Sequence, residues 1–338
     1  MRLLIVTPEQ PRICGNWVSA CRFQAGLQQL GHQVEVLETG LGPSRLEAAV
    51  AKYVPELVLL LHAYRSGRPW LASRGQGRLP FLVLLTGTDI HQGLDQPEQR
   101  PTIHTILQTA AAILIQNPLT VGELAARYPQ LAPRLHYLPP GITLGNAPWD
   151  LRQPYGIAAD AVLFLHPAGV RPVKGNLELL QLFDPVAAAE PRCRVAFCGP
   201  LLDAEYAERF LDALKARPWA SYLGEIPLAA MPAALCQCDV VCNNSSNEGL
   251  PNSLLEAASL GRPMLVRDIE GNRAVVEDGG NGLYYQNQEE FVVQALALIR
   301  NPALRQRLSR PQAERYLPER EAFQLEQLCR LVLTQAGR

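Results

Sequence analysis

Two glutamates eight positions apart, Glu248 and Glu256, stand in the segment of this sequence best suited to chemistry. Residues 244–257 read NSSNEGLPNSLLEA, a small polar run that follows a short apolar stretch and leads into a helical pattern. Gly249 permits a sharp turn, and Asn252 or Ser253 can cap the helix so that its first N–H groups face an anion. Two carboxylates across such a turn can point into one cleft from different depths. The alternative is a capping box with a solvated glutamate.

A basic pair forms the second candidate. The chain holds 28 arginines but only three lysines, and Lys174 follows Arg171 by three positions in the segment 166–176, HPAGVRPVKGN. Because this segment comes directly after an apolar run, we expect both cations at the mouth of a parallel sheet, where α/β proteins bind ligands. A guanidinium and an ammonium together suit a diphosphate. Two solvated loop cations are the alternative.

The two commonest nucleotide-binding fingerprints are missing. Residues 7–16, TPEQPRICGN, occupy the first strand-to-helix turn without the G-x-G-x-x-G pattern, and no G-x-x-x-x-G-K-[ST] occurs in the chain. This disfavours a nicotinamide dehydrogenase but not nucleotide binding as such. Gly15, at a predicted helix start, would leave backbone N–H groups free for an anion or a sugar. Turn chemistry is the simpler alternative for this glycine.

Short apolar runs alternate with longer amphipathic stretches, which predicts βα units and parallel sheets. In the first half we predict strands at residues 2–7, 33–37, 57–62, 81–85, 112–115 and 136–138, and a helix at 16–30 that Gly31 ends. In the second half we predict strands at 161–166, 194–198, 221–223, 240–242 and 263–267, and helices at 202–216 and 253–260.

The two series of strands are separated by the proline-rich residues 138–149, which begin LPPGI. We therefore predict an N-terminal domain of residues 1–145 and a C-terminal domain of residues 146–318. Residues 310–318 are polar and broken by prolines, as in a linker, and a last helix is predicted at 319–334.

The composition narrows the class of protein. Of 338 residues, 48% are hydrophobic and 19% charged, and the net charge of −1 lacks the basic excess of a nucleic-acid binder. The apolar runs fall short of the roughly 18–20 residues of a membrane span, and the N-terminus does not read as a signal peptide. Cys236, Cys238 and Cys242 lack the C-x-x-C spacing of a zinc site. We expect a cytoplasmic protein with reduced cysteines, no metal and no nucleic-acid partner.

The segment from Glu248 to Glu256 resembles the E-x7-E motif of retaining glycosyltransferases, and the whole chain is similar to glycosyltransferase family 4. Further matching stretches are GNWVSA at 15–20, LHAYRSGR at 61–68, TGTD at 86–89, RPVK at 171–174, GEIP at 224–227 and GNRAVV at 271–276. The resemblance implies an α/β fold of the GT-B type, with two Rossmann-like domains whose parallel sheets face a central cleft. It also implies that the final helix, about 319–338, packs back on the N-terminal domain.

The resemblance assigns roles to single residues. A nucleotide sugar, with a UDP-sugar as the default, would bind mainly to the C-terminal domain, and the acceptor to the N-terminal one. Arg171 and Lys174 would meet the diphosphate, Glu256 the ribose hydroxyls, and Glu248 the donor sugar. The other implied donor-binding positions are loop and turn residues: Gly15, Asn16, Gly169, Glu225, Ile226, Gly249, Leu250, Pro251, Asn252 and Ser253.

Departures from the family pattern raise two further candidates. Many relatives carry a histidine just before Gly-x-Asp to touch the donor sugar, and here that position is Thr86. His62, at the end of the preceding predicted strand, is the candidate to replace it, with a structural role as the alternative. Asp89, in the Gly-Thr-Asp loop, is the candidate for an acceptor contact or a base, and a helix N-cap is its alternative. The spacing from Arg171 to Lys174 is also shorter than in most of the family.

The expected reaction is a metal-independent, retaining sugar transfer to an unidentified acceptor, without a bound cofactor. Arg171, Lys174 and helix N–H groups would stabilise the charge of the leaving nucleoside diphosphate. Residues 65–78 hold four arginines and Trp70, which could bind an anionic acceptor or a membrane surface, or form a solvated face. Two alternatives stay open: a catalytically silent homologue that binds nucleotide sugars, and a transferase to a small anionic acceptor, like the selenosugar synthases that share the Gly-Thr-Asp stretch.

Overall fold

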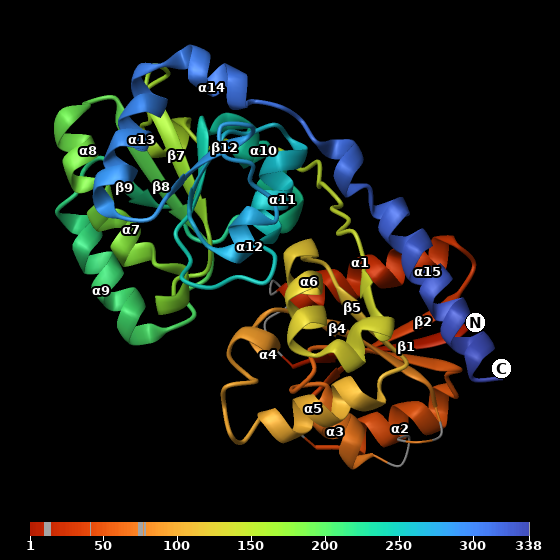
Figure 1. The fold of residues 1–338 in the computed structure, drawn as a ribbon. Helices are drawn as coiled ribbons and strands as arrows, with labels where there is room; N and C mark the ends of the chain where they lie inside the picture. Colours follow the sequence, from red (N-terminus) through yellow and green to blue (C-terminus); the bar gives the residue numbers. More distant parts are fainter. Residues whose placement is uncertain (10–14, 41, 74–76, 78, 338) are drawn as a thin grey trace. The chain divides into compact units, whose positions relative to one another are not determined.

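The computed structural model describes residues 1–9, 15–40, 42–73, 77 and 79–337. The chain divides into two compact units (Figure 1). Unit 1 contains residues 1–143 and 316–338, and unit 2 contains residues 144–315. The chain therefore leaves unit 1, forms unit 2, and returns to unit 1 for its last helix.

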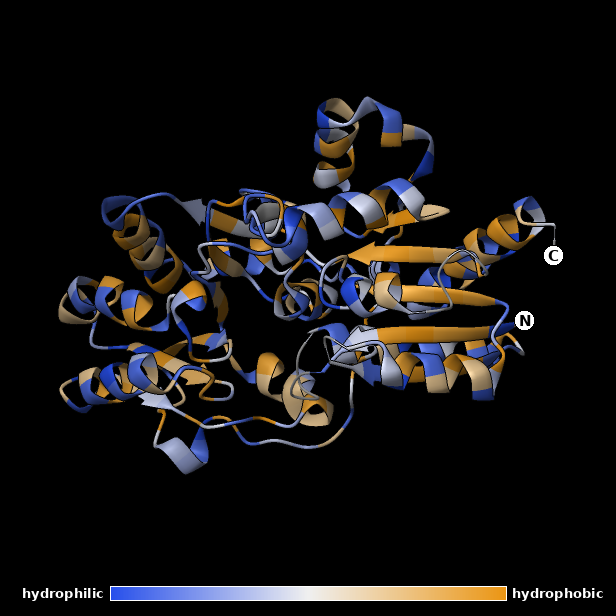
Figure 2. Cartoon of the chain, turned by 90° about the horizontal axis from the view of Figure 1, so that it is seen from below, coloured by the Kyte–Doolittle hydropathy of each residue, from blue (hydrophilic) through white to orange (hydrophobic). Residues whose placement is uncertain are grey.

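Unit 1 is built on a six-stranded sheet in which all paired strands are parallel, in the order β2-β1-β3-β4-β5-β6. The strands are β1 (Arg2–Pro8), β2 (Gln33–Thr39), β3 (Leu57–Leu61), β4 (Phe81–Leu85), β5 (Ala112–Ile115) and β6 (Leu135–Tyr137). Strands β3, β4 and β5 are buried on both faces, and their sequences are continuous apolar runs, as parallel strands covered by helices require. Figure 2 shows strands beside the N-terminus of the chain as hydrophobic along most of their length.

Helices cover both faces of this sheet (Figure 1). They are α1 (Gly15–Gln29), α2 (Ser44–Tyr53), α3 (Gly67–Ala72), α4 (Thr88–His91), α5 (Arg100–Thr109), α6 (Pro118–Arg127) and α15 (Pro318–Gln335). One core packs α1 and α15 against the sheet, and the other packs α2, α3, α5 and α6 against it. Gly31 ends α1 with a φ of +82°, in the left-handed conformation that glycine adopts without strain.

Helix α15 is held on α1 by close packing and by a buried ion pair. A Cβ on Gly26 would lie 2.6 Å from Cβ of Ala322, so the missing side chain lets the two helices approach. Arg22 Nε and Nη2 donate to the two carboxylate oxygens of Glu321 at 2.5 and 2.9 Å. Gln116 Nε2, from the end of β5, donates to the same carboxylate at 2.6 Å. The C-terminal helix is therefore an integral part of unit 1.

Unit 2 contains a second six-stranded sheet with parallel pairing, in the order β12-β11-β10-β7-β8-β9. Its strands are β7 (Val162–Pro167), β8 (Cys193–Cys198), β9 (Ala220–Tyr222), β10 (Val240–Asn243), β11 (Met264–Arg267) and β12 (Gly282–Tyr285). Its helices are α7 (Asn176–Leu182), α8 (Asp184–Ala189), α9 (Ala204–Lys215), α10 (Met231–Gln237), α11 (Asn252–Ser259), α12 (Glu270–Arg273), α13 (Gln288–Arg300) and α14 (Pro302–Leu308).

An aromatic cluster forms the centre of the unit 2 core. The ring of Phe183 lies 4.9 Å from that of Phe164 and 4.8 Å from that of Phe291, centroid to centroid, and the ring planes are steeply inclined. This core joins β7 and β8 to helices α7, α8, α9 and α13. The sheet is thereby held rigidly beneath the loops that follow its strands.

The predicted fold class, α/β with two parallel sheets, is confirmed. Each predicted strand lies within two residues of an observed one, but β12 was not predicted. This strand has only four residues, GLYY, and directly follows turn residues, so the sequence shows no separate apolar run there. Within the described part of the chain, no helix combines the length and apolar character that a bilayer crossing requires.

Candidate active site

The loops that follow β7 and β10 are joined into one polar surface in unit 2. These strands are neighbours in the sheet, and their carboxyl ends lie at the same edge. Asn244 Nδ2 donates to the carbonyl of Gly175 at 2.8 Å, and the Ser246 N–H donates to the carbonyl of Val173 at 2.9 Å. Gly175 has a φ of +62°, and a Cβ there would lie 2.7 Å from Asn244. Only glycine therefore lets the two loops meet in this way.

Lys174 and Glu248 form a largely buried ion pair on this surface. Lys174 Nζ donates to Glu248 Oε1, and the two side chains are 18% and 12% exposed. Ser245 Oγ donates to the same oxygen at 2.7 Å, and Asn243 Nδ2 at 3.4 Å. Burial by itself raises the pKa of the Glu248 carboxyl, but Lys174 and the two polar side chains overcome this and hold the pKa below its usual value. Glu248 is therefore an ionised carboxylate at neutral pH.

Arg171 differs from Lys174 because its charge is exposed. Its backbone N–H donates to Asn176 Oδ1 at 3.4 Å, which fixes the main chain. Within the described residues, its guanidinium has no hydrogen-bond or ion-pair partner. The two cations predicted as a pair therefore differ: Lys174 is bonded to Glu248, whereas the whole guanidinium of Arg171 is available to an anion.

His166 joins the strands beneath this pair. Its ring is fully buried, and Nδ1–H donates to the carbonyl of Cys242 at 3.0 Å. Burial lowers the pKa of His166 to about 4, so the imidazole is neutral at physiological pH. We conclude that it connects the end of β7 to β10, directly below the loops that carry Lys174 and Glu248.

The segment between Glu248 and Glu256 forms a turn and the start of α11. Pro251 is the N-cap of this helix in an extended conformation, and no side chain caps it. The prediction that Asn252 or Ser253 caps the helix is therefore wrong. The fixed φ of proline suits the extended cap position, so the helix begins directly at residue 252 and both polar residues lie in its first turn. Gly249, Leu250 and Glu256 are partly exposed, and Pro251 is buried.

Three further predicted residues lie in loops at the same edge of the sheet. Gly169 follows β7, and a Cβ there would lie 2.6 Å from Leu202 in the loop after β8. Glu225 and Ile226 follow β9, the first exposed and the second buried. The loop after β8 is joined to the loop after β9, because the Gly199 N–H donates to the carbonyl of Gly224 at 2.9 Å. The predicted site residues of unit 2 thus lie in the loops after β7, β9 and β10 and in the first two turns of α11.

Gly271 and Asn272, which the sequence analysis matched to the family without assigning them a role, pack against the Glu248 loop. A Cβ on Gly271, in α12, would lie 2.3 Å from the carbonyl oxygen of Glu248. Asn272 is fully buried, and its Nδ2 donates to the Arg267 carbonyl at 2.8 Å and to Asn243 Oδ1 at 3.4 Å. Their position just after β11, at the same sheet edge, is the signal that could have identified them.

In unit 1, His62 connects the loops after β3 and β4. It is 3% exposed and has a φ of +83°, which is uncommon for a non-glycine residue. Its Nδ1 accepts the N–H groups of Tyr64 and Arg65 at 3.1 and 3.2 Å. The ring proton must then lie on Nε2, which donates to Thr88 Oγ1 at 3.2 Å. Burial lowers the pKa of His62, in keeping with this neutral form.

Asp89 joins the same two loops. Its side chain is completely buried, and its two carboxylate oxygens accept the N–H groups of Ala63 at 2.8 Å and Thr86 at 3.0 Å. Gly87, not Asp89, occupies the N-cap of α4. A direct acceptor contact or a role as a base for Asp89 stays a prediction. The structure shows a carboxylate that holds two backbone segments together.

Gly15 and Asn16 begin α1, after the end of β1, and lie in unit 1 with His62 and Asp89. Residues 10–14 of that turn, including Cys14, lie outside the described residues, as do Arg74 and Arg78 of the predicted basic segment. Trp70 of that segment is fully buried against Phe81, so it belongs to the core and not to a binding face. The predicted residues are thus collected in two groups, one in each unit.

Residues 148–315 match the family model of glycosyl transferases group 1. This segment includes the whole polar surface of unit 2, with Arg171, Lys174, Glu248 and Glu256. The chain belongs to the group 1 glycosyltransferases. It is 27% identical over 321 residues to glycosyltransferase 1 domain-containing protein 1 of Xenopus tropicalis, and the match covers 92% of this chain and 91% of that protein. The resemblance proposed from the sequence motifs is confirmed.

Solved structures show that this glycosyltransferase has the GT-B fold. Sucrose-phosphate synthase from Thermosynechococcus elongatus matches with a TM-score of 0.82 at 16% identity, over 99% of both chains. Anabaena HepE in complex with UDP-glucose matches with a TM-score of 0.77 at 16% identity, over 98% of this chain and 99% of that chain. At these identities the likeness establishes the fold and nothing finer.

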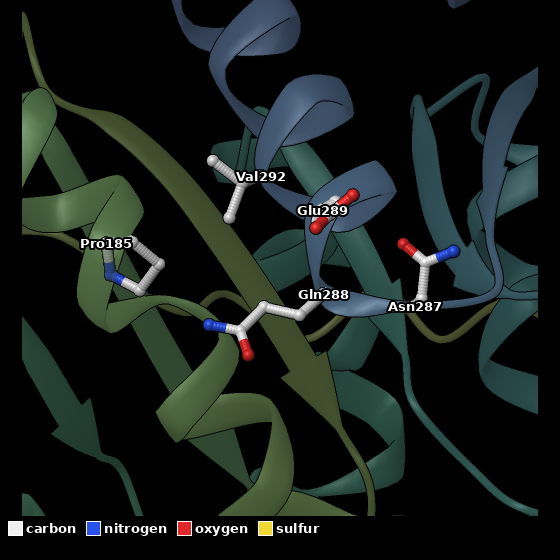
Figure 3. Close-up of a pocket in the computed structure, with 5 residues that line it drawn as sticks. All are labelled: Pro185, Asn287, Gln288, Glu289 and Val292. Carbon is white, nitrogen blue, oxygen red and sulfur yellow. The ribbon is translucent and has the colours of Figure 1, made fainter.

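A separate hollow of about 850 Å³ lies on unit 2 of the glycosyltransferase. Pro185 from α8 lines it together with Asn287, Gln288, Glu289 and Val292 from the beginning of α13 (Figure 3). None of the predicted site residues lines it. Among the described residues, no group of three or more histidine, cysteine or acidic side chains is placed to hold a metal ion.

Proposed function

We propose that this group 1 glycosyltransferase is a retaining enzyme that transfers a hexosyl group from a UDP-sugar, without a metal, to an acceptor that is not yet identified. The observation that carries the proposal is the ionised Glu248 paired with Lys174, next to the exposed Arg171, at the carboxyl ends of β7 and β10. HepE, a structural neighbour, was solved with UDP-glucose. The Acholeplasma laidlawii relative, 26% identical over 160 residues, is named alpha-monoglucosyldiacylglycerol synthase.

In this proposal unit 2 binds the donor. Arg171 meets the diphosphate with its free guanidinium, and the turn 249–253 offers backbone N–H groups. Glu256 accepts hydrogen bonds from the ribose hydroxyls, and Glu248 accepts them from the sugar. The loops with Gly169, Glu225 and Ile226 receive the base, and Gly15 and Asn16 of unit 1 complete the donor contacts.

The bond between the anomeric carbon and the diphosphate oxygen breaks, and the acceptor oxygen bonds to the same face of that carbon. The acceptor proton passes to the departing phosphate oxygen. Arg171 and Lys174 stabilise the negative charge that develops on the nucleoside diphosphate, which is the task that a metal ion would otherwise perform. Six described cysteines form no disulfide, which fits a reducing compartment such as the cytoplasm: Cys193, Cys198, Cys236, Cys238, Cys242 and Cys329.

Ligand-dependent thermal unfolding tests the donor assignment. UDP, GDP and ADP are each added to the wild-type protein, to Glu256→Ala, and to Glu208→Ala, which removes an exposed carboxylate from α9 as a matched control. Ligand at about 100 times its dissociation constant adds roughly 2.7 kcal/mol of stability. We expect a rise in melting temperature with UDP that is lost in Glu256→Ala and kept in Glu208→Ala. Equal shifts for all three nucleotides, or none, would contradict the donor assignment.

A silent homologue is the second candidate, since His62 and Asp89 are both occupied by backbone contacts. Slow hydrolysis of UDP-glucose, with NMR detection of the glucose anomer first formed, separates the two. The enzyme should release α-glucose, and Glu248→Gln should lose turnover while still binding UDP. Binding of UDP without any turnover in the wild type, across the acceptors tested below, would favour the silent homologue.

A further inference from the structure

The buried His62 ring organises two exposed residues on unit 1. Its Nδ1 accepts the Arg65 N–H, and its Nε2–H donates to the Thr88 hydroxyl. Arg65 and Thr88 are both exposed, whereas His62 is 3% exposed and Asp89 is fully buried. One imidazole therefore fixes the main chain of Arg65 and the hydroxyl of Thr88 at the carboxyl ends of neighbouring strands β3 and β4.

The hydrogen bonds of this cluster leave specific groups available. Because Thr88 Oγ1 accepts from His62, its own hydrogen points elsewhere, and no acceptor for it occurs among the described residues. The guanidinium of Arg65 likewise has no partner in the part of the chain that the structure describes, but its charge acts on His62 and contributes to the lowered pKa of that ring. Arg68, one helical turn further on, is exposed as well.

The carboxylate of this cluster, Asp89, already accepts hydrogen bonds from the main chain. Asp89 accepts two backbone N–H groups and is sealed from solvent, so it does not neutralise Arg65 from the surface. The left-handed backbone of His62 is a conformation that non-glycine residues rarely keep unless the surrounding structure demands it. This backbone conformation lets the His62 ring contact the loops after both β3 and β4.

We propose that Arg65 and the Thr88 hydroxyl bind the anionic group of the acceptor, a phosphate or a carboxylate, and that His62 is the positioning residue for both. The guanidinium provides paired N–H donors that match such an anion, and the hydroxyl adds a third donor. This inference rests on the proposed glycosyl transfer and adds to it the chemical class of the acceptor.

A matched set of small polyols tests the charge preference. Glycerol, sn-glycerol 3-phosphate, glycerate and 3-amino-1,2-propanediol differ in the charge of one substituent, and each is titrated by NMR into protein saturated with UDP. The bound UDP occupies the donor site, so that the anions do not report on Arg171. We expect the two anions to bind at least about tenfold more tightly than glycerol or the amine. Equal binding of all four would overturn the proposal.

Variants then assign the site. Arg65→Gln should weaken anion binding about tenfold or more, while Arg320→Gln, which changes an exposed arginine on α15 of the same unit, should not. Thr88→Val should weaken it by a few fold, and Thr88→Ser should restore it. Unchanged anion affinity in Arg65→Gln would remove the subsite.

A double-mutant cycle isolates the part of His62. Asparagine tolerates the left-handed backbone and can accept the two N–H groups, but it leaves Thr88 without its donor. His62→Asn should therefore resemble Thr88→Val, and the double variant should be no weaker than either. Fully additive losses would mean that His62 does not act through Thr88.

Two sources of the anion are separated by vesicle sedimentation. Binding to vesicles that contain phosphatidylglycerol, but not to pure phosphatidylcholine, with loss in Arg65→Gln, assigns a lipid headgroup. Binding of free glycerol phosphate alone assigns a small soluble acceptor. Failure of UDP to bind the wild type would count against the proposed donor chemistry, whereas normal UDP binding without anion preference would count against this subsite alone.

Discussion

The ion pair between Arg22 and Glu321 provides the sharpest test of how unit 1 is held together. Their side chains are 6% and 1% exposed, and the carboxylate receives two bonds from the guanidinium and one from Gln116. Arg22→Met or Glu321→Leu removes one partner and leaves the other charge buried without compensation. Such a loss costs about 3–5 kcal/mol, whereas removing both charges in the double variant costs far less.

The expected effect on melting follows from the size of the unit. Unit 1 spans residues 1–143 and 316–338. At about 2.1 cal/mol/K per residue, the entropy of unfolding of a unit of roughly 170 residues is near 0.35 kcal/mol/K, so each single variant should lower the melting temperature of unit 1 by about 9–14 °C. Calorimetry of the two single variants, the double variant and a control, Arg45→Met, measures this. The control breaks an ion pair of unit 1 whose side chains are 63% and 66% exposed. The control should change by only a degree or two. A double variant as unstable as the sum of the single ones would refute the reasoning.

Three further predictions concern unit 2. In the folded state the pKa of His166 is lowered to about 4, whereas in the unfolded chain it is about 6.5. The free energy of unfolding should therefore fall by roughly 3 kcal/mol as the pH drops from about 6.5 to 4. His166→Phe should flatten this pH dependence in urea titrations. Gly271→Ala should weaken UDP-glucose binding in calorimetric titrations, because its Cβ would lie 2.3 Å from the Glu248 carbonyl oxygen. In the control Gly122→Ala the new Cβ has no atom within 4 Å, so this variant should stabilise α6 by about 0.5–1 kcal/mol. Lys174→Met should lower turnover about 100-fold. Because only the hydrogen bonds from Ser245 and Asn243 then oppose the effect of burial, it should also raise the pKa of Glu248 and move the acid limb of the pH–rate profile upward.

Each of these predictions has a contrary result. An unchanged pH dependence in His166→Phe would mean that another group titrates in that range. Normal UDP-glucose affinity in Gly271→Ala would show that α12 does not position Glu248. An unshifted acid limb in Lys174→Met would mean that the pKa of Glu248 does not depend on Lys174.

The sequence was sufficient to predict the sheets because their central strands are continuous apolar runs. Leu57–Leu61 and Phe81–Leu85 are buried along their whole length, and such runs are legible without tertiary information. The unit 2 loops were predictable for a related reason. Polar residues that directly follow a buried strand, such as Lys174 and Glu248, must lie at the carboxyl edge of a parallel sheet.

What the sequence could not predict depends on geometry between distant segments. The pairing of Lys174 with Glu248, and the exposure of Arg171, arise from loops that meet 74 positions apart. The left-handed backbone of His62, and the tautomer that its neighbours impose, are tertiary effects with no local signature. The N-cap of α11 was misassigned because propensity favours asparagine or serine, whereas the position of Pro251 decides where the helix begins.

The position of helix α15 in the chain affects how unit 1 folds during synthesis. Its apolar residues cover a face of the unit 1 sheet that includes Leu59, Leu84 and Leu114, yet it follows all of unit 2 in the chain. At about 5–20 residues per second, the ribosome needs roughly 10–35 s to make the intervening 144–315 segment. During that interval this face of the nascent sheet is covered by α1 but not by α15, so part of its leucine surface stays exposed. This surface is where chaperones would engage the growing polypeptide, and they would be released when α15 docks.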